Sequence, residues 1–195
     1  MKDQFAKHLS PDIVLFAERL SDCFRTYLQL DAIAPGNEQA TYVTGFVHGI
    51  LDDLLVSVKL LVTGKLTAAG NLMRQALEGV AVATLCSARC TITLRTRKRT
   101  IQVNYFQLLK ARSPELEASK AVDHLDLNCA TLGIKAQFVE QLRAARRVYH
   151  PFSHPTMLSI ACRVGLGDMS TIYVGGHFDE SKIDVYKTEI KRRYL

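Results

Sequence analysis

Long apolar runs are missing from this sequence of 195 residues. A helix that crosses a membrane needs about 20 consecutive, mostly apolar residues. The best run, Leu54–Val62, is short and contains Lys59. The first residues, MKDQFAKHLSPD, have neither the apolar core nor the small-residue cleavage site of a secretory signal peptide. We therefore predict a cytoplasmic protein with no membrane partner.

Several motifs that mark common enzymes are also missing. The sequence contains no GxxxxGKS or GxxxxGKT phosphate loop, no GxGxxG after a strand, no HExxH and no GxSxG. Glu-x-x-His pairs, which a di-iron helical bundle would need, do not occur. His48 and Asp52, one helical turn apart, would need a distant third ligand to hold a metal. We predict no metal and no cofactor.

Cysteine is present in an odd number, and its spacing indicates no zinc site. The five cysteines lie among apolar neighbours: Cys23, Cys86, Cys90, Cys129 and Cys162. Cys86 and Cys90 are one helical turn apart, but no second pair completes a tetrahedral set of ligands. Free and mostly buried thiols are the expected state.

Acidic residues are absent between Arg89 and Arg112, although the segment holds seven basic ones. This excess is larger than the net charge of the whole chain, which is +6. A basic band attracts polyanions, and RNA or another polyanion is the predicted partner. The predicted nucleic-acid contacts are Arg95, Arg97, Lys98 and Arg99. The alternative is an ordinary surface helix whose acidic partners come from the next segment, which offers Glu115, Glu117, Asp123 and Asp126.

Apolar residues recur at helical spacing through most of the chain, which predicts a mainly α antiparallel helical bundle. Ser10-Pro11-Asp12 is a typical helix start, and Gly64 suits a tight turn between two antiparallel helices. Threonines between 91 and 100 weaken the prediction of a helix over 93–110, because β-branched residues are poorer helix formers. The expected helices cover about 10–30, 38–62, 65–89, 93–110, 114–133 and 134–150.

The pattern changes after Pro155. Residues 157–164 and 170–174 resemble a short β-hairpin near the C-terminus. A last helix follows from Ser181, and its pattern is still running at KRRYL, so we expect the natural chain to continue past Leu195. The prediction is a single helical domain over 1–195, with its core in 38–150 and the hairpin and last helix in 156–195. We expect it to form a homodimer.

The segment RAARRVYHPFSHP, residues 143–155, is the main candidate for chemistry. On a helix, Arg143, Arg147 and His150 recur at i, i+4 and i+7 and share one face. Pro151 ends or kinks that helix, and His154 lies just past it. Histidine changes charge near neutral pH, and arginine binds phosphate as a planar fork. The alternative is a solvated basic face with favourable charge at a helix C-terminus.

Six residues separate Arg143 from His150, and six separate Arg147 from His154. This spacing resembles the R-x(4–6)-H motif of the HEPN superfamily of helical domains, many of which are metal-independent RNases. Together with GKLTAAGNLMRQALEGVAVATL, which carries Arg74 and Glu78, it resembles bacterial domain-of-unknown-function families allied to that superfamily, over roughly residues 40–160. The resemblance implies that a histidine deprotonates the attacking 2′-hydroxyl and an arginine stabilises the pentavalent phosphate. The implied catalytic residues are Arg143, Arg147, His150 and His154.

A second hypothesis is a non-enzymatic helical module that binds a partner protein or a small ligand. Residues 143–154 then form a polar interface, and the predicted ligand-binding residues are Arg74, Glu78, Tyr149 and Ser153. Arg74 and Glu78 lie one turn apart on an otherwise apolar helix, so a structural ion pair is the alternative for them. Tyr149 also belongs to the apolar stripe of its helix.

Overall fold

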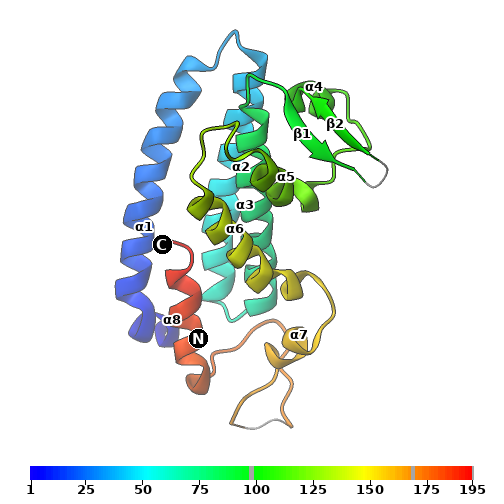
Figure 1. Ribbon diagram of the computed structural model, residues 1–195. Coiled ribbons are helices and arrows are strands. Elements are labelled where there is room, and N and C mark those ends of the chain that lie inside the picture. Colours follow the sequence, from blue (N-terminus) through cyan, green and yellow to red (C-terminus); the bar gives the residue numbers. More distant parts are fainter. Residues whose placement is uncertain (97–98, 168–169, 195) are drawn as a thin grey trace. The chain divides into compact units, whose positions relative to one another are not determined.

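The computed structural model describes residues 1–96, 99–167 and 170–194 and is mainly α-helical, as predicted (Figure 1). The α-helices and strands, in chain order, are α1 (Lys2–Ile33), α2 (Glu38–Leu61), α3 (Leu66–Cys86), β1 (Ile92–Arg95), β2 (Thr100–Val103), α4 (Tyr105–Lys110), α5 (Ala121–Asn128), α6 (Ala136–Tyr149), α7 (Met157–Ala161) and α8 (Ile183–Lys191). Three short 3-10 helices accompany them: η1 (Ala118–Lys120), η2 (His150–Ser153) and η3 (Glu180–Lys182). Within the described residues, no helix is both long enough and apolar enough to span a bilayer.

The chain divides into two compact units, and the first consists of residues 1–26, 51–75 and 149–195. Its buried core joins both ends of the chain, and consists of Phe5, Leu9, Leu61, Leu66, Ala69, Cys162, Tyr186 and Ile190. The rings of Phe5 and Tyr186 meet edge to face with centroids 4.9 Å apart. The Tyr194 hydroxyl donates to Asp12 at 2.9 Å. These contacts attach α8 to the first half of α1.

The second unit consists of residues 27–50 and 76–148. Its core surrounds the end of α3 and includes the fully buried Leu85, Ile92, Leu94, Val122, Leu125 and Val139. The Gln39 amide donates to the carbonyl oxygens of Cys86 at 2.7 Å and Ala88 at 3.0 Å, which holds the start of α2 against the end of α3. Helices α1, α2 and α3 each contribute residues to both units.

The predicted helix over 93–110 is wrong in its first half, because β1 (Ile92–Arg95) and β2 (Thr100–Val103) pair there as the two strands of a β-hairpin. Strand β1 pairs with β2 in antiparallel register, with Leu94 opposite Ile101. Ile92 and Leu94 alternate into the core, as in a half-buried strand. The Asn128 side chain accepts from the N–H of Thr93 at 2.7 Å and donates to its carbonyl at 2.8 Å. The strand thus depends on a partner far along the chain.

The hairpin predicted near the C-terminus is wrong in its position, since the two-stranded hairpin lies mid-chain. Residues 157–161 are helical instead, as α7. A reciprocal capping box starts this helix: the Thr156 hydroxyl accepts from the N–H of Ser159, and the Ser159 hydroxyl accepts from the N–H of Thr156. An isolated antiparallel bridge between Val164 and Ile172 is the β-structure described between residues 157 and 174.

Helix α1 starts at Lys2, so the predicted start at Ser10 is also wrong. Pro11 lies inside the helix, and the Ser10 hydroxyl donates back to the carbonyl of Ala6. Proline inside a helix costs a hydrogen bond. Burial of Phe5 and Leu9, one turn apart, stabilises the extra turns ahead of it.

All five thiols are free, as predicted, but only Cys86 and Cys162 are buried. Burial raises the pKa of Cys86 to about 11 and also raises the pKa of Cys162. Because the thiolate is the reactive form, we expect a disulfide reagent at about pH 8 to modify the exposed Cys23 and Cys90 quickly. Cys86 and Cys162 should react only after denaturant is added. A time course of reagent absorbance measures this, and rapid reaction of all five thiols in the native protein would contradict it.

Candidate functional site

The short helix η2 brings the two predicted catalytic histidines together in the first unit. Pro151 occupies its first turn, and His154 follows it in an extended conformation, so the chain leaves α6 at the predicted point. The rings of His150 and His154 meet at 65°, with centroids 4.8 Å apart. Both side chains are exposed. Two imidazoles at this separation are able to act on the same bound molecule.

Arg74, on α3, contacts the same turn. One of its guanidinium nitrogens donates to the Ser153 hydroxyl, which in turn donates to the carbonyl oxygen of His150 at 2.9 Å. We call Arg74, His150, Ser153 and His154 the histidine cluster. It unites two residues predicted to be catalytic with two predicted to bind a ligand, and all four lie in the first unit.

A close contact between α3 and η2 explains this geometry. The Phe152 ring lies directly against Gly70, where an added Cβ would be 2.5 Å from ring carbons. Gly70 precedes Arg74 by one helical turn, and Phe152 precedes Ser153 by one residue. The contact between Gly70 and Phe152 therefore fixes how closely η2 approaches α3. This spacing lets the Arg74 guanidinium reach the Ser153 hydroxyl.

Gly70→Ala is expected to lower the free energy of unfolding by about 1–3 kcal/mol, because Phe152 must move to admit the methyl group. Gly49→Ala is the matched control. Gly49 also lies inside a helix, but its added Cβ would meet no atom within 4 Å, so alanine should stabilise by about 0.5–1 kcal/mol. Urea unfolding of both variants measures the difference, and equal effects would contradict the packing role of Gly70.

Tyr149 lies directly before the histidine cluster and is buried in a network of polar groups. Its hydroxyl donates to Glu189 at 3.0 Å. Glu189 also accepts from Arg193 at 3.1 Å, and Arg193 donates to the Ser57 hydroxyl at 3.0 Å. Burial, with Glu189 as the next cause, raises the pKa of Tyr149. The predicted ligand-binding phenol is thus bonded internally and anchors the end of α6 to α8.

Arg143 and Arg147 belong to the second unit, as does Glu78 on α3. Arg143 forms ion pairs with Asp126 and, at 3.2 Å, with Glu140. Arg147 pairs with Glu140 at 3.3 Å. Carboxylates therefore neutralise much of the charge that these arginines would offer to phosphate. Their predicted action together with the histidines stays a prediction.

Two of the predicted nucleic-acid contacts, Arg95 and Arg99, lie next to the ends of β1 and β2 that adjoin each other in sequence. Arg95 ends β1 and lines a cavity of about 560 Å³ with Arg143 and Lys120, although Asp123 and Asp126 line it too. Arg99 precedes β2 and pairs with Glu115 at 3.3 Å. Arg97 and Lys98 lie outside the described residues. Arg99 thus has an acidic partner in the next segment, as the alternative expected, although it precedes a strand and not a helix.

Two further observations bear on the class of protein. Among the residues that the structure describes, no group of three or more His, Cys, Asp or Glu side chains is placed to hold a metal ion. Comparison with protein-family models, curated proteins and solved structures gives no match. The function must therefore be argued from the chemistry of the residues themselves.

The sequence did not indicate a second group of polar residues, at the start of α3. Lys65, Arg163, Tyr173 and His177 line one cavity in the first unit. Gly64 was assigned only a turn, and residues 170–174 only a strand of the predicted hairpin. The two glycines directly before His177 were the available signal for this site in the sequence. A cavity built from distant segments, however, has no local sequence pattern.

Proposed function

We propose that this protein is a HEPN-like RNA-handling protein that cleaves the phosphodiester backbone without a metal ion. The observation that supports this best is the histidine cluster. It places two solvent-accessible imidazoles beside a turn that is bonded to a guanidinium. General acid–base catalysis needs one group to accept a proton and another to donate one, and histidine does both near neutral pH.

In the proposed reaction, one imidazole of the histidine cluster accepts the proton of a ribose 2′-hydroxyl. The 2′-oxygen then attacks the adjacent phosphorus, and the bond between phosphorus and the 5′-oxygen breaks. The second imidazole, protonated at the start, donates its proton to the leaving 5′-oxygen. The products are a 2′,3′-cyclic phosphate and a 5′-hydroxyl. Arg74, supported by Ser153, stabilises the negative charge on the non-bridging oxygens.

The charge and thiol chemistry of the chain support the substrate class. A net charge of +6 favours association with a polyanion, and Arg95 and Arg99 flank the tip of the hairpin. Five free cysteines are typical of proteins in a reducing compartment, which fits a cytoplasmic RNA substrate.

The test is incubation of the purified full chain with a fluorescent single-stranded RNA in excess EDTA. We expect shorter fragments that end in a 2′,3′-cyclic phosphate, identified by mass spectrometry. An RNA with 2′-O-methyl riboses is the matched control and should stay intact, because it lacks the nucleophile. An RNA that remains uncut under all these conditions would contradict the proposed cleavage.

Binding without cleavage is the second candidate function, as a module for a partner or ligand. The ion pairs of Arg143 and Arg147 with carboxylates favour this second function. Retention of uncut RNA on a filter, with affinity falling as salt rises, would support it. Each phosphate neutralised should contribute a slope of about −0.7 in log K against log salt for a single strand.

A further inference from the structure

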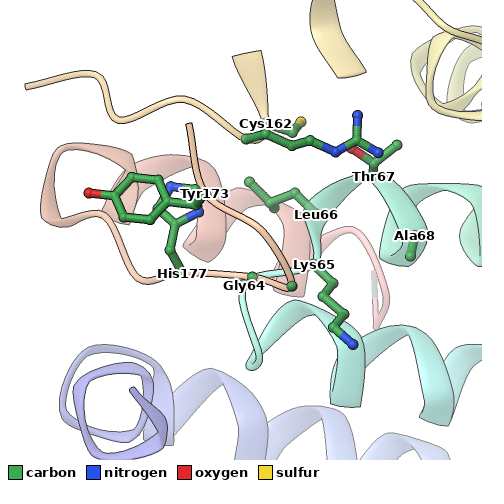
Figure 2. Close-up of a pocket in the computed structure, with 11 residues that line it drawn as sticks. Gly64, Lys65, Leu66, Thr67, Ala68, Cys162, Tyr173 and His177 are labelled. Atoms are coloured by element: carbon green, nitrogen blue, oxygen red, sulfur yellow. The ribbon is translucent and has the colours of Figure 1, made fainter. Parts of the chain in front are cut away.

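The cavity at the start of α3 lies in the first unit and shares no residue with the histidine cluster. Its volume is about 220 Å³. It is lined by residues 64–68, 162–163, 173 and 175–177 (Figure 2). This volume is smaller than the range of about 300–1,000 Å³ that drug-sized ligands occupy. The cavity therefore suits a small molecule and not a polymer chain.

Two glycines allow its walls to approach each other closely. A Cβ on Gly64 would lie 2.0 Å from the carbonyl oxygen of His177, and a Cβ on Gly176 would lie 2.1 Å from that of Thr63. Both glycines have positive φ, at 73° and 132°, where side chains are disfavoured. The segment 175–177 is thereby held against the turn between α2 and α3.

The charged residues that line the cavity are both cations. Lys65 and Arg163 come from opposite segments, and no carboxylate lines the cavity within the described part of the chain. Arg163 donates to the carbonyl of Ser159 at 3.0 Å through one nitrogen. A guanidinium carries five N–H donors, so others remain for an anion. The first N–H groups of α3, which have no acceptor inside the helix, add further donors.

Uncharged side chains also line the cavity. The Tyr173 ring stacks on the His177 ring (Figure 2). The ring centroids are 4.0 Å apart, and the planes meet at 9°. The Thr67 hydroxyl oxygen is buried beside the Cys162 thiol, a weak hydrogen-bond partner, and makes no hydrogen bond to oxygen or nitrogen in the described residues. A buried hydroxyl without such a partner is costly, and an oxygen-rich ligand would satisfy it.

His177 also contacts a buried lysine, Lys182. The Lys182 ammonium is buried, donates to the carbonyls of Ala161 and Val164, and lies 3.5 Å from Nε2 of His177. Burial, and then the charge of Lys182, lower the pKa of His177, while Asp179 opposes that change. The lowered pKa favours the neutral imidazole, whose Nε2 faces the Lys182 ammonium.

We propose that this cavity binds the phosphate group of a small phosphorylated metabolite. Arg163 contacts the phosphate oxygens, the N–H groups at the start of α3 and the Thr67 hydroxyl donate to them, and the stacked rings contact the carbon skeleton. Lys65 adds positive charge at the edge of the site. The ligand is a phosphate monoester, because the cavity is lined by cations and N–H donors and also by ring carbon. This site is independent of the proposed RNA cleavage.

Isothermal titration of the full chain with glycerol 3-phosphate tests the proposal, with glycerol as the uncharged comparison. We expect binding of the phosphate ester alone. Arg163→Gln should weaken it at least tenfold and Thr67→Val severalfold, whereas Lys59→Gln, a change at an exposed lysine that does not line the cavity, should leave it unchanged. Circular dichroism checks that each variant is folded.

Three outcomes would overturn the proposal. The first is no heat of binding at about 10 mM ester, which would place Kd above the millimolar range. The second is equal affinity of the wild type and Arg163→Gln. The third is binding of a 5′-phosphorylated dinucleotide without binding of glycerol 3-phosphate, which would assign the phosphate to an RNA end. None of these outcomes depends on whether the protein cleaves RNA.

Discussion

Replacing His150 or His154 with alanine is expected to lower kcat for RNA cleavage by about 10²–10⁴-fold, the usual contribution of a positioned proton-transfer group. Each histidine serves one of the two proton transfers in the proposed reaction, so either loss should be severe. Both side chains are exposed, and the melting temperature should change little. Gel-based cleavage rates and thermal unfolding measure the two effects.

The pH profile separates catalysis from a structural role. The wild type should give a bell-shaped dependence of kcat on pH, because one imidazole must be neutral and the other protonated. Each single variant should lose one limb of the bell. His48→Ala is the control, since His48 is an exposed histidine of the second unit. A cluster variant that cleaves as fast as this control would remove the histidines from the mechanism.

Arg193→Met is expected to lower the free energy of unfolding by about 3–5 kcal/mol, the cost of removing one member of a buried ion pair. The Arg193 side chain is fully buried and that of Glu189 is 5% exposed. Besides its ion pair with Glu189 at 3.1 Å, Arg193 donates to the Ser57 hydroxyl at 3.0 Å. Methionine fills similar volume but supplies none of these hydrogen bonds, so the loss is electrostatic.

Arg192→Met is the matched control for that change. Arg192 pairs with the same carboxylate at 2.7 Å, but its side chain is 43% exposed. An exposed ion pair contributes about 0–1 kcal/mol, so this variant should unfold at nearly the wild-type urea concentration. Equal losses from Arg192→Met and Arg193→Met would show that burial of the pair does not matter.

The helices were predictable where a strong apolar period meets a clear end signal. Residues 38–62 and 65–89 were expected as helices around Gly64, and α2 and α3 cover 38–61 and 66–86. Helix α6 likewise ends where Pro151 required. Periodicity and proline act within a few residues, so the sequence displays them directly.

The hairpin was missed because its stabilising partners are distant in sequence. Ile92 and Leu94 alternate as in a strand, but so short a stretch does not by itself separate a strand from a helix. The Asn128 side chain that bonds both backbone groups of Thr93 lies 35 residues away. The threonines around it were the local hint, because β-branched residues favour strands.

The candidate site was likewise predictable only in the part that depends on local sequence. Two histidines flanking a proline turn could be predicted from RRVYHPFSHP, and the structure brings them together. The bond from Arg74 to Ser153 spans 79 residues and depends on the fit of Phe152 against Gly70. Helical spacing alone favoured Arg143 and Arg147, since a one-dimensional pattern does not reveal the carboxylates of Asp126 and Glu140.

The core that joins Phe5 and Leu9 to Tyr186 and Ile190 has a consequence for biosynthesis. A ribosome adds about 5–20 residues each second, so the first apolar residues of α1 wait on the order of 10 s or more before α8 is made. The segments of the second unit, residues 27–50 and 76–148, also leave the ribosome before α8 is made. During that interval the start of α1 is an exposed apolar segment, and a nascent-chain chaperone has its best opportunity to bind there.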